Sequence, residues 1–201
     1  MTNPSAVLDD FVARLSFTPD KFQIDAFAAL VAGESVVVAA PTSAGKTLVA
    51  EAAVALAVAA NRRAFYTTPI KALSNQKFAD FSELYGPDQV GLLTGDNSIN
   101  GQAPVIVMTT EVLRNMIYAR SRDLSGLGVV VLDEVHYLQD SARGPVWEEI
   151  IIHLPEGIPV VGLSATVANA AQFTDWVATR RGTTRLVQEN TRPVPLSGQY
   201  L

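Results

Sequence analysis

Two adjacent carboxylates, Asp133 and Glu134, follow a run of β-branched apolar residues in the stretch VVVLDEVH (129–136). Side by side at the end of a strand, two acids repel each other and lose hydration unless a cation or hydrogen-bond donors meet them. A metal ion, a proton transfer or a structural salt bridge could each supply that compensation. The choice among the three depends on residues elsewhere in the chain.

A second candidate site lies at residues 39–50, which read AAPTSAGKTLVA between a strand-like run and a helical pattern. Small residues followed by Gly45, Lys46 and Thr47 match the phosphate-binding loop, although Ala40 occupies the usual place of the first glycine. Backbone N–H groups would cradle phosphates, the lysine would meet the terminal phosphates and the threonine would offer its hydroxyl to Mg²⁺. A chance match in an alanine-rich turn is disfavoured by the flanking elements. The loop predicts a nucleoside triphosphate site.

This loop supplies a partner for the two acids. In phosphate-loop NTPases a second strand delivers an Asp to the Mg²⁺ opposite the Ser or Thr of the loop. Asp133 fits that role, and Glu134 would orient or deprotonate the attacking water. Because Mg²⁺ keeps most of its waters, Thr47 and Asp133 suffice as protein ligands. Local chemistry alone does not assign His136.

Short apolar runs alternate with helical patterns along the chain. Candidate strands are residues 35–40, 64–68, 90–94, 105–110, 129–133, 159–164 and 184–188. Candidate helices are residues 20–31, 46–60, 70–85, 111–119, 146–153 and 169–178. Several strands are apolar throughout, which is typical of a parallel sheet covered on both faces. We therefore expect a doubly wound α/β domain whose ligands bind at the carboxyl ends of the strands.

Composition limits the classes of protein to consider. The 201 residues suit one domain, and 48% hydrophobic against 17% charged residues disfavours disorder. The net charge of -5 is unlike that of a protein that grips nucleic acid by bulk charge. Without cysteine, disulfides and cysteine-bound zinc are excluded. The polar, acidic N-terminus and the absence of a long apolar span predict a cytoplasmic protein without a membrane segment.

Taken together, the loop APTSAGKT, DEVH at 133–136 and SAT at 164–166 resemble the DExH-box helicases of superfamily 2. Further stretches look like the Ski-like (superkiller, exosome-associated) RNA helicases, most of all their actinobacterial HelY-type members. These stretches are residues 65–77, 91–99, 105–118, 133–149 and 163–173. The resemblance extends from Phe17 to Pro195, and it implies a RecA-like fold.

For the nucleotide, the resemblance implies that Phe22 and Gln23 read adenine. The residues that would wrap the phosphates of ATP are Thr42, Ser43, Ala44, Gly45, Lys46 and Thr47. Asp133 and Glu134 would be the Mg²⁺-binding and water-activating acids. His136 would relay the nucleotide state to the turn Ser164, Ala165 and Thr166, which couples hydrolysis to movement between domains.

The resemblance also implies a track for the RNA backbone. Its residues would be Pro69, Ile70, Lys71, Asn75, Gly95, Asp96, Thr110, Glu111 and Arg114. Such contacts use backbone amides, hydroxyls and helix N-termini more than bulk charge, which fits the negative net charge. For each of these residues, a helix cap or a turn is the competing interpretation.

We expect three parts of the chain. Residues 1–16 would be an N-terminal extension, 17–190 the first RecA-like domain, and 191–201 a connector towards a second RecA-like domain. Because that second domain supplies arginine fingers, worth about 10³–10⁵ in rate, this chain should bind nucleotide with little turnover. The implied partners are RNA and an RNA-decay nuclease. A DNA helicase of the same superfamily and a non-catalytic nucleotide-dependent interaction module are the alternatives.

Overall fold

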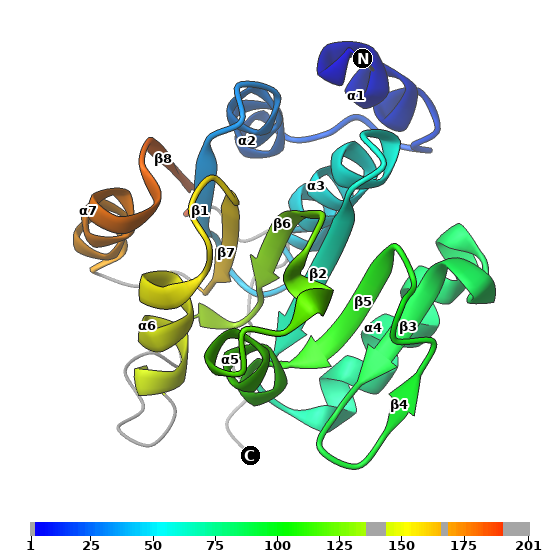
Figure 1. The fold of residues 1–201 in the computed structure, drawn as a ribbon. Coiled ribbons are helices and arrows are strands. Elements are labelled where there is room, and N and C mark those ends of the chain that lie inside the picture. The colour runs from blue at the N-terminus through cyan, green and yellow to red at the C-terminus, as the bar shows by residue number, and fades with distance from the viewer. Residues whose placement is uncertain (1–2, 136–143, 166–168, 191–201) are drawn as a thin grey trace, which may run out of the picture.

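A mostly parallel sheet organises the protein, and the computed structural model describes residues 3–135, 144–165 and 169–190 of it (Figure 1). In the described residues the sheet has eight strands in the order β4-β3-β5-β2-β6-β7-β1-β8. The strands are β1 (Ser35–Ala39), β2 (Arg63–Thr68), β3 (Val90–Leu93), β4 (Ser98–Ile99), β5 (Val105–Thr109), β6 (Leu127–Leu132), β7 (Val160–Ser164) and β8 (Thr184–Gln188). All seven expected strands are confirmed. Only the β3–β4 pairing is antiparallel among the described strand pairs, and the two-residue β4 was not expected.

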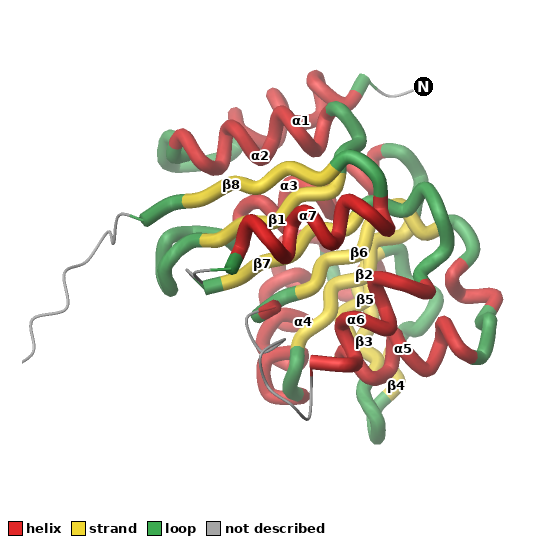
Figure 2. Tube along the Cα trace, turned by 90° about the vertical axis from the view of Figure 1, so that its left-hand side faces the viewer, coloured by secondary structure: helices red, strands yellow, loops and turns green. Residues whose placement is uncertain are grey.

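Helices cover both faces of this sheet. They are α1 (Pro4–Ala13), α2 (Lys21–Val31), α3 (Thr47–Ala59), α4 (Lys71–Tyr85), α5 (Thr110–Tyr118), α6 (Gly144–His153) and α7 (Ala170–Arg181). Helices α1 to α4 share one apolar core with the sheet, whereas α5, α6 and α7 share the other (Figure 2). No helix within the described ranges is both long and apolar enough to cross a membrane. The expected doubly wound α/β class is confirmed, and the cytoplasmic location stays a prediction.

Residues 64–66 of strand β2 show why several strands have no polar face. Ala64 and Tyr66 face the α1–α4 core, while Phe65 between them faces the α5–α7 core. All three residues are fully buried. When both faces of a strand are covered, the side chains on both faces are apolar. The sequence therefore lacks the alternation of apolar and polar residues that a half-exposed strand shows.

Helix α1 was not expected, although its signals are present. The Asn3 side chain accepts a hydrogen bond from the backbone N–H of Ser5 at 3.1 Å, which caps the helix. Leu8 is 5% exposed within the core, and the ring of Phe11 meets that of Phe27 edge-on at 6.1 Å. Residues ahead of position 17 therefore add to the apolar core through a short amphipathic helix.

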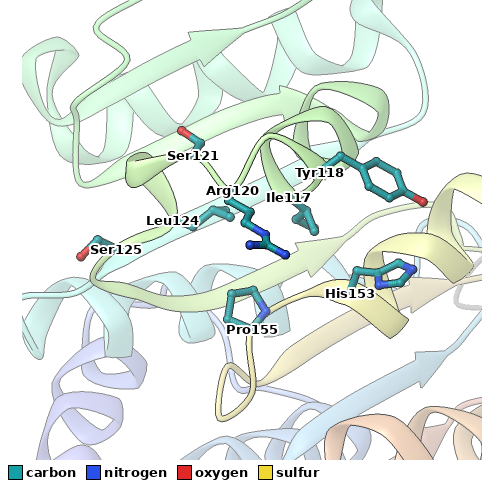
Figure 3. Close-up of a pocket in the computed structure, with 8 residues that line it drawn as sticks. All are labelled: Ile117, Tyr118, Arg120, Ser121, Leu124, Ser125, His153 and Pro155. Carbon is teal, nitrogen blue, oxygen red and sulfur yellow. The ribbon is translucent and has the colours of Figure 1, made fainter.

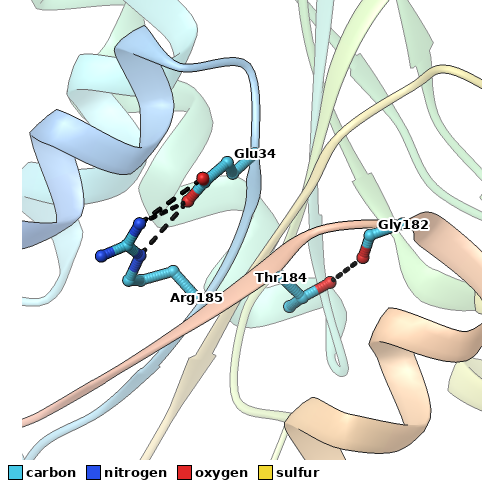
Figure 4. A network of polar contacts seen from close by, with 4 residues as sticks. All are labelled: Glu34, Gly182, Thr184 and Arg185. Carbon is cyan, nitrogen blue, oxygen red and sulfur yellow. Dashed lines mark hydrogen bonds and ion pairs between the residues drawn. The ribbon is translucent and has the colours of Figure 1, made fainter.

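The edge strand β8 is held mainly by its parallel pairing with β1. Beside that pairing, Arg185 places its guanidinium on both carboxylate oxygens of Glu34 at 3.1 to 3.4 Å (Figure 4). The hydroxyl of Thr184 donates to the carbonyl of Gly182 at 2.9 Å in the turn before the strand. An exposed ion pair of this kind adds less than about 1 kcal/mol, so backbone pairing dominates.

Candidate functional site

The strand order places the predicted nucleotide residues at one half of the carboxyl edge. The phosphate loop follows β1, Asp133 and Glu134 follow β6, and Ser164 ends β7. Since β6, β7 and β1 are neighbours in the sheet, these three strand ends lie next to one another. Chain segments more than 80 residues apart in sequence therefore meet at one place.

The phosphate loop has the backbone and the lysine of an anion-binding turn. Ser43 and Gly45 have positive φ angles of 69° and 79°, which turn successive N–H groups into one concave loop. The Nζ of Lys46 donates to the carbonyls of Ala40 and Pro41 at 2.8 and 2.9 Å. Its ammonium group is thus held over the loop by two acceptors that a phosphate would replace.

Lys46 and the two acids share one electrostatic environment. Burial lowers the pKa of Lys46, while the nearby carboxylates of Glu134 and Asp133 act in the opposite direction. The acids that follow β6 therefore lie close enough to the phosphate loop to stabilise its cation. This answers part of the problem of two adjacent carboxylates, because a positive charge lies opposite them.

Asp133 is held at both of its carboxylate oxygens. Its Oδ2 accepts a hydrogen bond from the hydroxyl of Tyr66 at 2.6 Å, and its Oδ1 accepts from the backbone N–H of Glu134 at 2.8 Å. The Asp133 N–H donates to the carbonyl of Thr67 at 3.0 Å. Burial, followed by the Asp133 charge, raises the pKa of Tyr66 well above its ordinary value. Tyr66 was not among the predicted site residues, because no local spacing indicates it.

The turn after β6 carries backbone strain. Glu134 has a φ of 57°, in the left-handed region that a residue with a Cβ enters at a cost of about 1–2 kcal/mol. Asp133 compensates locally by accepting the N–H of Glu134. Such strain is found where a turn must aim a side chain, which fits a functional acid at this position.

The donor atoms near the loop fit Mg²⁺. Thr47 begins α3 and offers a hydroxyl, while Asp133 offers carboxylate oxygens that still have lone pairs beside their two hydrogen bonds. Oxygen donors of this type, few in number and completed by water, suit Mg²⁺. Within the described ranges no group of three or more His, Cys, Asp and Glu side chains could hold a metal ion.

A pocket of about 410 Å³ lies beside the loop and contains Gln23. The side chain of Gln23 accepts from the Asp20 N–H at 2.8 Å and donates to the Gly45 carbonyl at 3.0 Å, so it joins α2 to the loop. Phe22 is 3% exposed and belongs to the apolar core. The aromatic ring that lines the pocket is Phe17, which is 55% exposed. Sequence reasoning missed Phe17, although an aromatic residue just ahead of the helix was a usable signal.

Of the predicted coupling turn Ser164-Ala165-Thr166, the structure describes Ser164 and Ala165. Ser164 is buried, and its carbonyl accepts the N–H of Ala40 at 3.2 Å, which ties the end of β7 to the start of the phosphate loop. Ala165 follows it at intermediate exposure. His136 and Thr166 lie outside the described residues, as does the predicted connector 191–201. The relay between His136 and the Ser-Ala-Thr turn stays a prediction.

The predicted nucleic-acid residues gather at the other half of the same edge. Strands β3, β5 and β2 are neighbours, so the turns after them lie next to one another. These turns hold Gly95 and Asp96 after β3, Thr110 and Glu111 after β5, and Pro69, Ile70 and Lys71 after β2. The strand order therefore separates the two predicted functions along one edge of the sheet.

Individual residues of this track differ in availability. Ile70 is 40% exposed, and Lys71 forms an ion pair with Asp96 across two turns. Asn75 is exposed in the second turn of α4, whereas Arg114 in α5 is 3.8 Å from Glu149 of α6. Pro69 and Thr110 are buried, and the Thr110 hydroxyl donates to the Thr68 carbonyl at 3.0 Å. We therefore expect Pro69 and Thr110 to shape the track rather than supply side-chain contacts to RNA.

A larger pocket of about 690 Å³ lies where α5 and α6 end (Figure 3). Arg120 and Pro155 line it, and the rings of Tyr118 and His153 lie 5.7 Å apart at its rim. Helix carboxyl ends carry partial negative charge, which disfavours phosphate. None of the predicted site residues lines this pocket, so volume alone does not locate the nucleotide site.

A phosphate loop after one strand of a parallel sheet, with an acid pair after the next strand but one, defines a phosphate-loop NTPase domain of RecA-like architecture. Residues 20–173 match the DEAD/DEAH box helicase family, and the chain belongs to that family. Of the curated relatives, "Probable helicase HelY" of Mycobacterium tuberculosis is 60% identical over 95% of this chain. "DExH-box ATP-dependent RNA helicase DExH15 chloroplastic" of Arabidopsis thaliana is 53% identical over 96%, and "Superkiller complex protein 2" of Homo sapiens is 50% identical over 90%.

These relatives confirm the resemblance to Ski-like DExH-box helicases. The chain spans only 21% of HelY, 17% of the Arabidopsis protein and 14% of the human protein. Among solved structures, the helicase MrfA bound to DNA superposes with a TM-score of 0.75 at 23% identity, over 94% of this chain and 30% of that chain. This likeness confirms the fold.

Proposed function

We propose that the protein is the ATP-binding domain of an ATP-dependent RNA helicase that couples ATP hydrolysis to unwinding or translocation on RNA. The observation that carries the proposal is that the carboxylates of Asp133 and Glu134, after β6, act electrostatically on Lys46 in the loop after β1. The name of the Arabidopsis relative, an ATP-dependent RNA helicase, supports both ATP and RNA as ligands.

The positions of the residues support a role for each of them in this proposal. Gln23 and Phe17 hold the adenine in the pocket beside the loop, and the segment from Thr42 to Thr47 wraps the phosphates. Lys46 leaves its two carbonyl acceptors for the terminal phosphates. Thr47 and Asp133 would hold Mg²⁺, which supplies positive charge against the phosphate oxygens when it is bound.

Glu134 acts on water in this proposal. It lies one residue beyond Asp133, in a turn where its own backbone has a φ of 57°. A carboxylate in hydrogen-bond reach of the attacking water orients it and accepts its proton, which contributes about 10²–10⁴ in rate. The two adjacent acids therefore have separate tasks, one towards the cation and one towards water.

The name of the Arabidopsis relative favours RNA as the substrate, with DNA as the second candidate. Exposed residues after β2 and β3, such as Lys71 and Gly95, suit contacts to a phosphate backbone, which do not distinguish RNA from DNA. The structural neighbour MrfA was solved with DNA bound, which favours keeping the alternative. Stimulation of ATP hydrolysis by RNA and by DNA, compared in the full-length protein, decides between them. A role in RNA processing or decay, with a nuclease partner, belongs to the same proposal.

Three substitutions test the nucleotide site. Glu134→Gln should keep ATP binding and abolish turnover in the full-length protein, since the amide cannot accept the proton. Asp133→Ala should weaken Mg²⁺-dependent ATP binding more than Glu134→Gln does, and Lys46→Ala should weaken nucleotide binding with or without Mg²⁺. Titration calorimetry and phosphate release measure these effects. Persistent turnover in Glu134→Gln, or equal binding loss in Asp133→Ala and Glu134→Gln, would contradict the assignment.

A further inference from the structure

Tyr66 is a buried polar group that the roles assigned above do not use. Its side chain is fully buried, and its hydroxyl donates a hydrogen bond to Oδ2 of Asp133 at 2.6 Å. The second carboxylate oxygen of Asp133 accepts the N–H of Glu134 at 2.8 Å. Hydrogen bonds to a charged acceptor are short and strong, so these two donors fix the rotation of the carboxylate.

Sheet register explains why Tyr66 reaches Asp133. Tyr66 on β2 pairs with Val131 on β6, and both side chains belong to the α1–α4 core. Asp133 lies two residues beyond Val131, which keeps it on the same face of the sheet. A diagonal neighbour on the next strand is within reach of a long aromatic side chain. The hydroxyl of Tyr66 therefore arrives under the carboxylate from the core side.

The Tyr66 ring is fixed as firmly as its hydroxyl. It meets the ring of Phe81 on α4 at 5.3 Å with an interplanar angle of 63°. Phe81 in turn stacks on Tyr85 at 6.1 Å. Aromatic packing fixes the Tyr66 ring, and the Tyr66 hydroxyl in turn fixes the Asp133 carboxylate. The orientation of Asp133 therefore depends on packing in the core.

We propose that Tyr66 is a positioning residue for the nucleotide-bound cation: it holds the Asp133 carboxylate in the orientation that Mg²⁺ requires. The proposal rests on the function proposed above, in which Asp133 is the carboxylate ligand of that ion. Groups that hydrogen-bond a metal ligand orient it, and their loss commonly costs about 10–100-fold in metal affinity. Tyr66 touches neither substrate nor metal in this role and acts only through Asp133.

Strand β2 also fixes the turn that follows it. Two residues beyond Tyr66, the Thr68 hydroxyl contacts that of Ser74 in α4 at 2.7 Å and donates to the Ile70 carbonyl at 3.0 Å. The turn that starts the predicted nucleic-acid track is thereby fixed to β2. Strand β2 thus holds both Tyr66, which contacts Asp133, and Thr68, which fixes the start of the predicted track.

The test compares Tyr66→Phe with Tyr85→Phe in the 201-residue chain. Both changes remove one hydroxyl from a tyrosine of the same aromatic cluster around Phe81, but only Tyr66 contacts Asp133. The affinity for a fluorescent ADP derivative is measured in excess Mg²⁺ and in excess EDTA, and the ratio of the two dissociation constants gives the Mg²⁺ dependence. Circular dichroism and thermal unfolding confirm that each variant is folded.

We expect Tyr66→Phe to reduce the Mg²⁺ dependence about 10-fold while leaving the affinity in EDTA unchanged. Tyr85→Phe should leave both affinities unchanged. In an Asp133→Ala background, Tyr66→Phe should have no further effect on the Mg²⁺ dependence, since its target is gone. If Tyr66→Phe lowers folding stability, the double-mutant comparison still tests the contact with Asp133, because all affinities are measured under conditions in which each variant is folded.

Three outcomes overturn the inference. Equal Mg²⁺ dependence of Tyr66→Phe and the unaltered chain would leave Tyr66 as a packing residue, with the proposed nucleotide site intact. An undiminished effect of Tyr66→Phe in the Asp133→Ala background would show that Tyr66 acts elsewhere. Failure of the unaltered chain to bind nucleotide under either condition would instead refute the proposed function.

Discussion

At the scale of single residues, Gly45 joins the phosphate loop to Gln23, the residue proposed to hold the base. Its φ of 79° is unfavourable for any residue with a Cβ, and a Cβ built there would lie 2.8 Å from Nε2 of Gln23. The same Nε2 donates to the Gly45 carbonyl at 3.0 Å. Gly45 is therefore required both for the turn and for the contact with Gln23.

Gly45→Ala should cost about 1–2 kcal/mol from the left-handed backbone and, in addition, displace Gln23 and weaken nucleotide binding. Gly33→Ala is the matched control, because Gly33 has a φ of 74° but no atom within 4 Å of a built Cβ. Urea unfolding and nucleotide titration measure the two effects. Equal losses of stability and equal nucleotide affinities in the two variants would argue against the role of the Gln23 contact.

Glu51 predicts a dependence of stability on pH. It lines the pocket that contains Gln23, and burial raises its pKa, while Lys77 acts in the opposite direction. The folded chain thus holds the Glu51 proton to a higher pH than the unfolded chain. Its contribution to stability is complete below the unfolded pKa of about 4.3 and is lost as the pH rises through the folded pKa.

Glu51→Gln should therefore match the unaltered chain at acidic pH and be more stable at neutral pH, since glutamine cannot ionise. The free energy of unfolding by urea, measured across this range, checks the prediction. Glu148→Gln, which changes an exposed glutamate of α6, is the control. A gain in stability of Glu51→Gln that is the same at every pH would contradict the explanation.

At the scale of elements, the segments that follow β2 and β3 are joined by the ion pair between Lys71 and Asp96. Lys71 begins α4, where a helix N-terminus and a lysine together favour phosphate. The hydrogen bonds from Lys71 and Thr94 lower the pKa of Asp96, so the acid stays charged within the predicted RNA track. The ion pair therefore competes with a phosphate for Lys71.

Asp96→Asn should raise the affinity for a single-stranded RNA, by less than about 10-fold, because exposed ion pairs are weak. Asp80→Asn is the control, since it releases Lys77 from a comparable pair within α4 that lies outside the predicted track. Fluorescence anisotropy at several salt concentrations measures both. Lower RNA affinity of Asp96→Asn would indicate that Asp96 itself contacts the RNA.

At the scale of the whole molecule, the chain corresponds to about a fifth of its HelY relative. We propose that catalysis needs a second RecA-like domain, whose arginine fingers are worth about 10³–10⁵ in rate. The 201-residue chain should accordingly bind nucleotide but release phosphate far more slowly than the full-length protein, with or without single-stranded RNA. Phosphate-release assays on both proteins check this. Robust RNA-stimulated hydrolysis by the 201-residue chain would refute it.

The sequence by itself determined the features that depend on neighbours along the chain. The apolar runs, Gly45-Lys46-Thr47 and Asp133-Glu134 are local patterns, so they predicted the parallel sheet, the phosphate loop and the acid pair. Helix α1 also has local signals, with a cap at Asn3 and an apolar Leu8 that is buried, so the sequence contained enough information to predict it.

Tertiary structure alone decided which of these features meet. The order β6-β7-β1 brings the acids to the loop, and the order β3-β5-β2 sets the predicted track apart from it. Tyr66 contacts Asp133, which is 67 residues away in the sequence. The contact depends on the register between β2 and β6, which the sequence of neither strand specifies by itself. Register and strand order come from the simultaneous packing of both faces of the sheet, which is why contacts of this kind cannot be read from spacing along the chain.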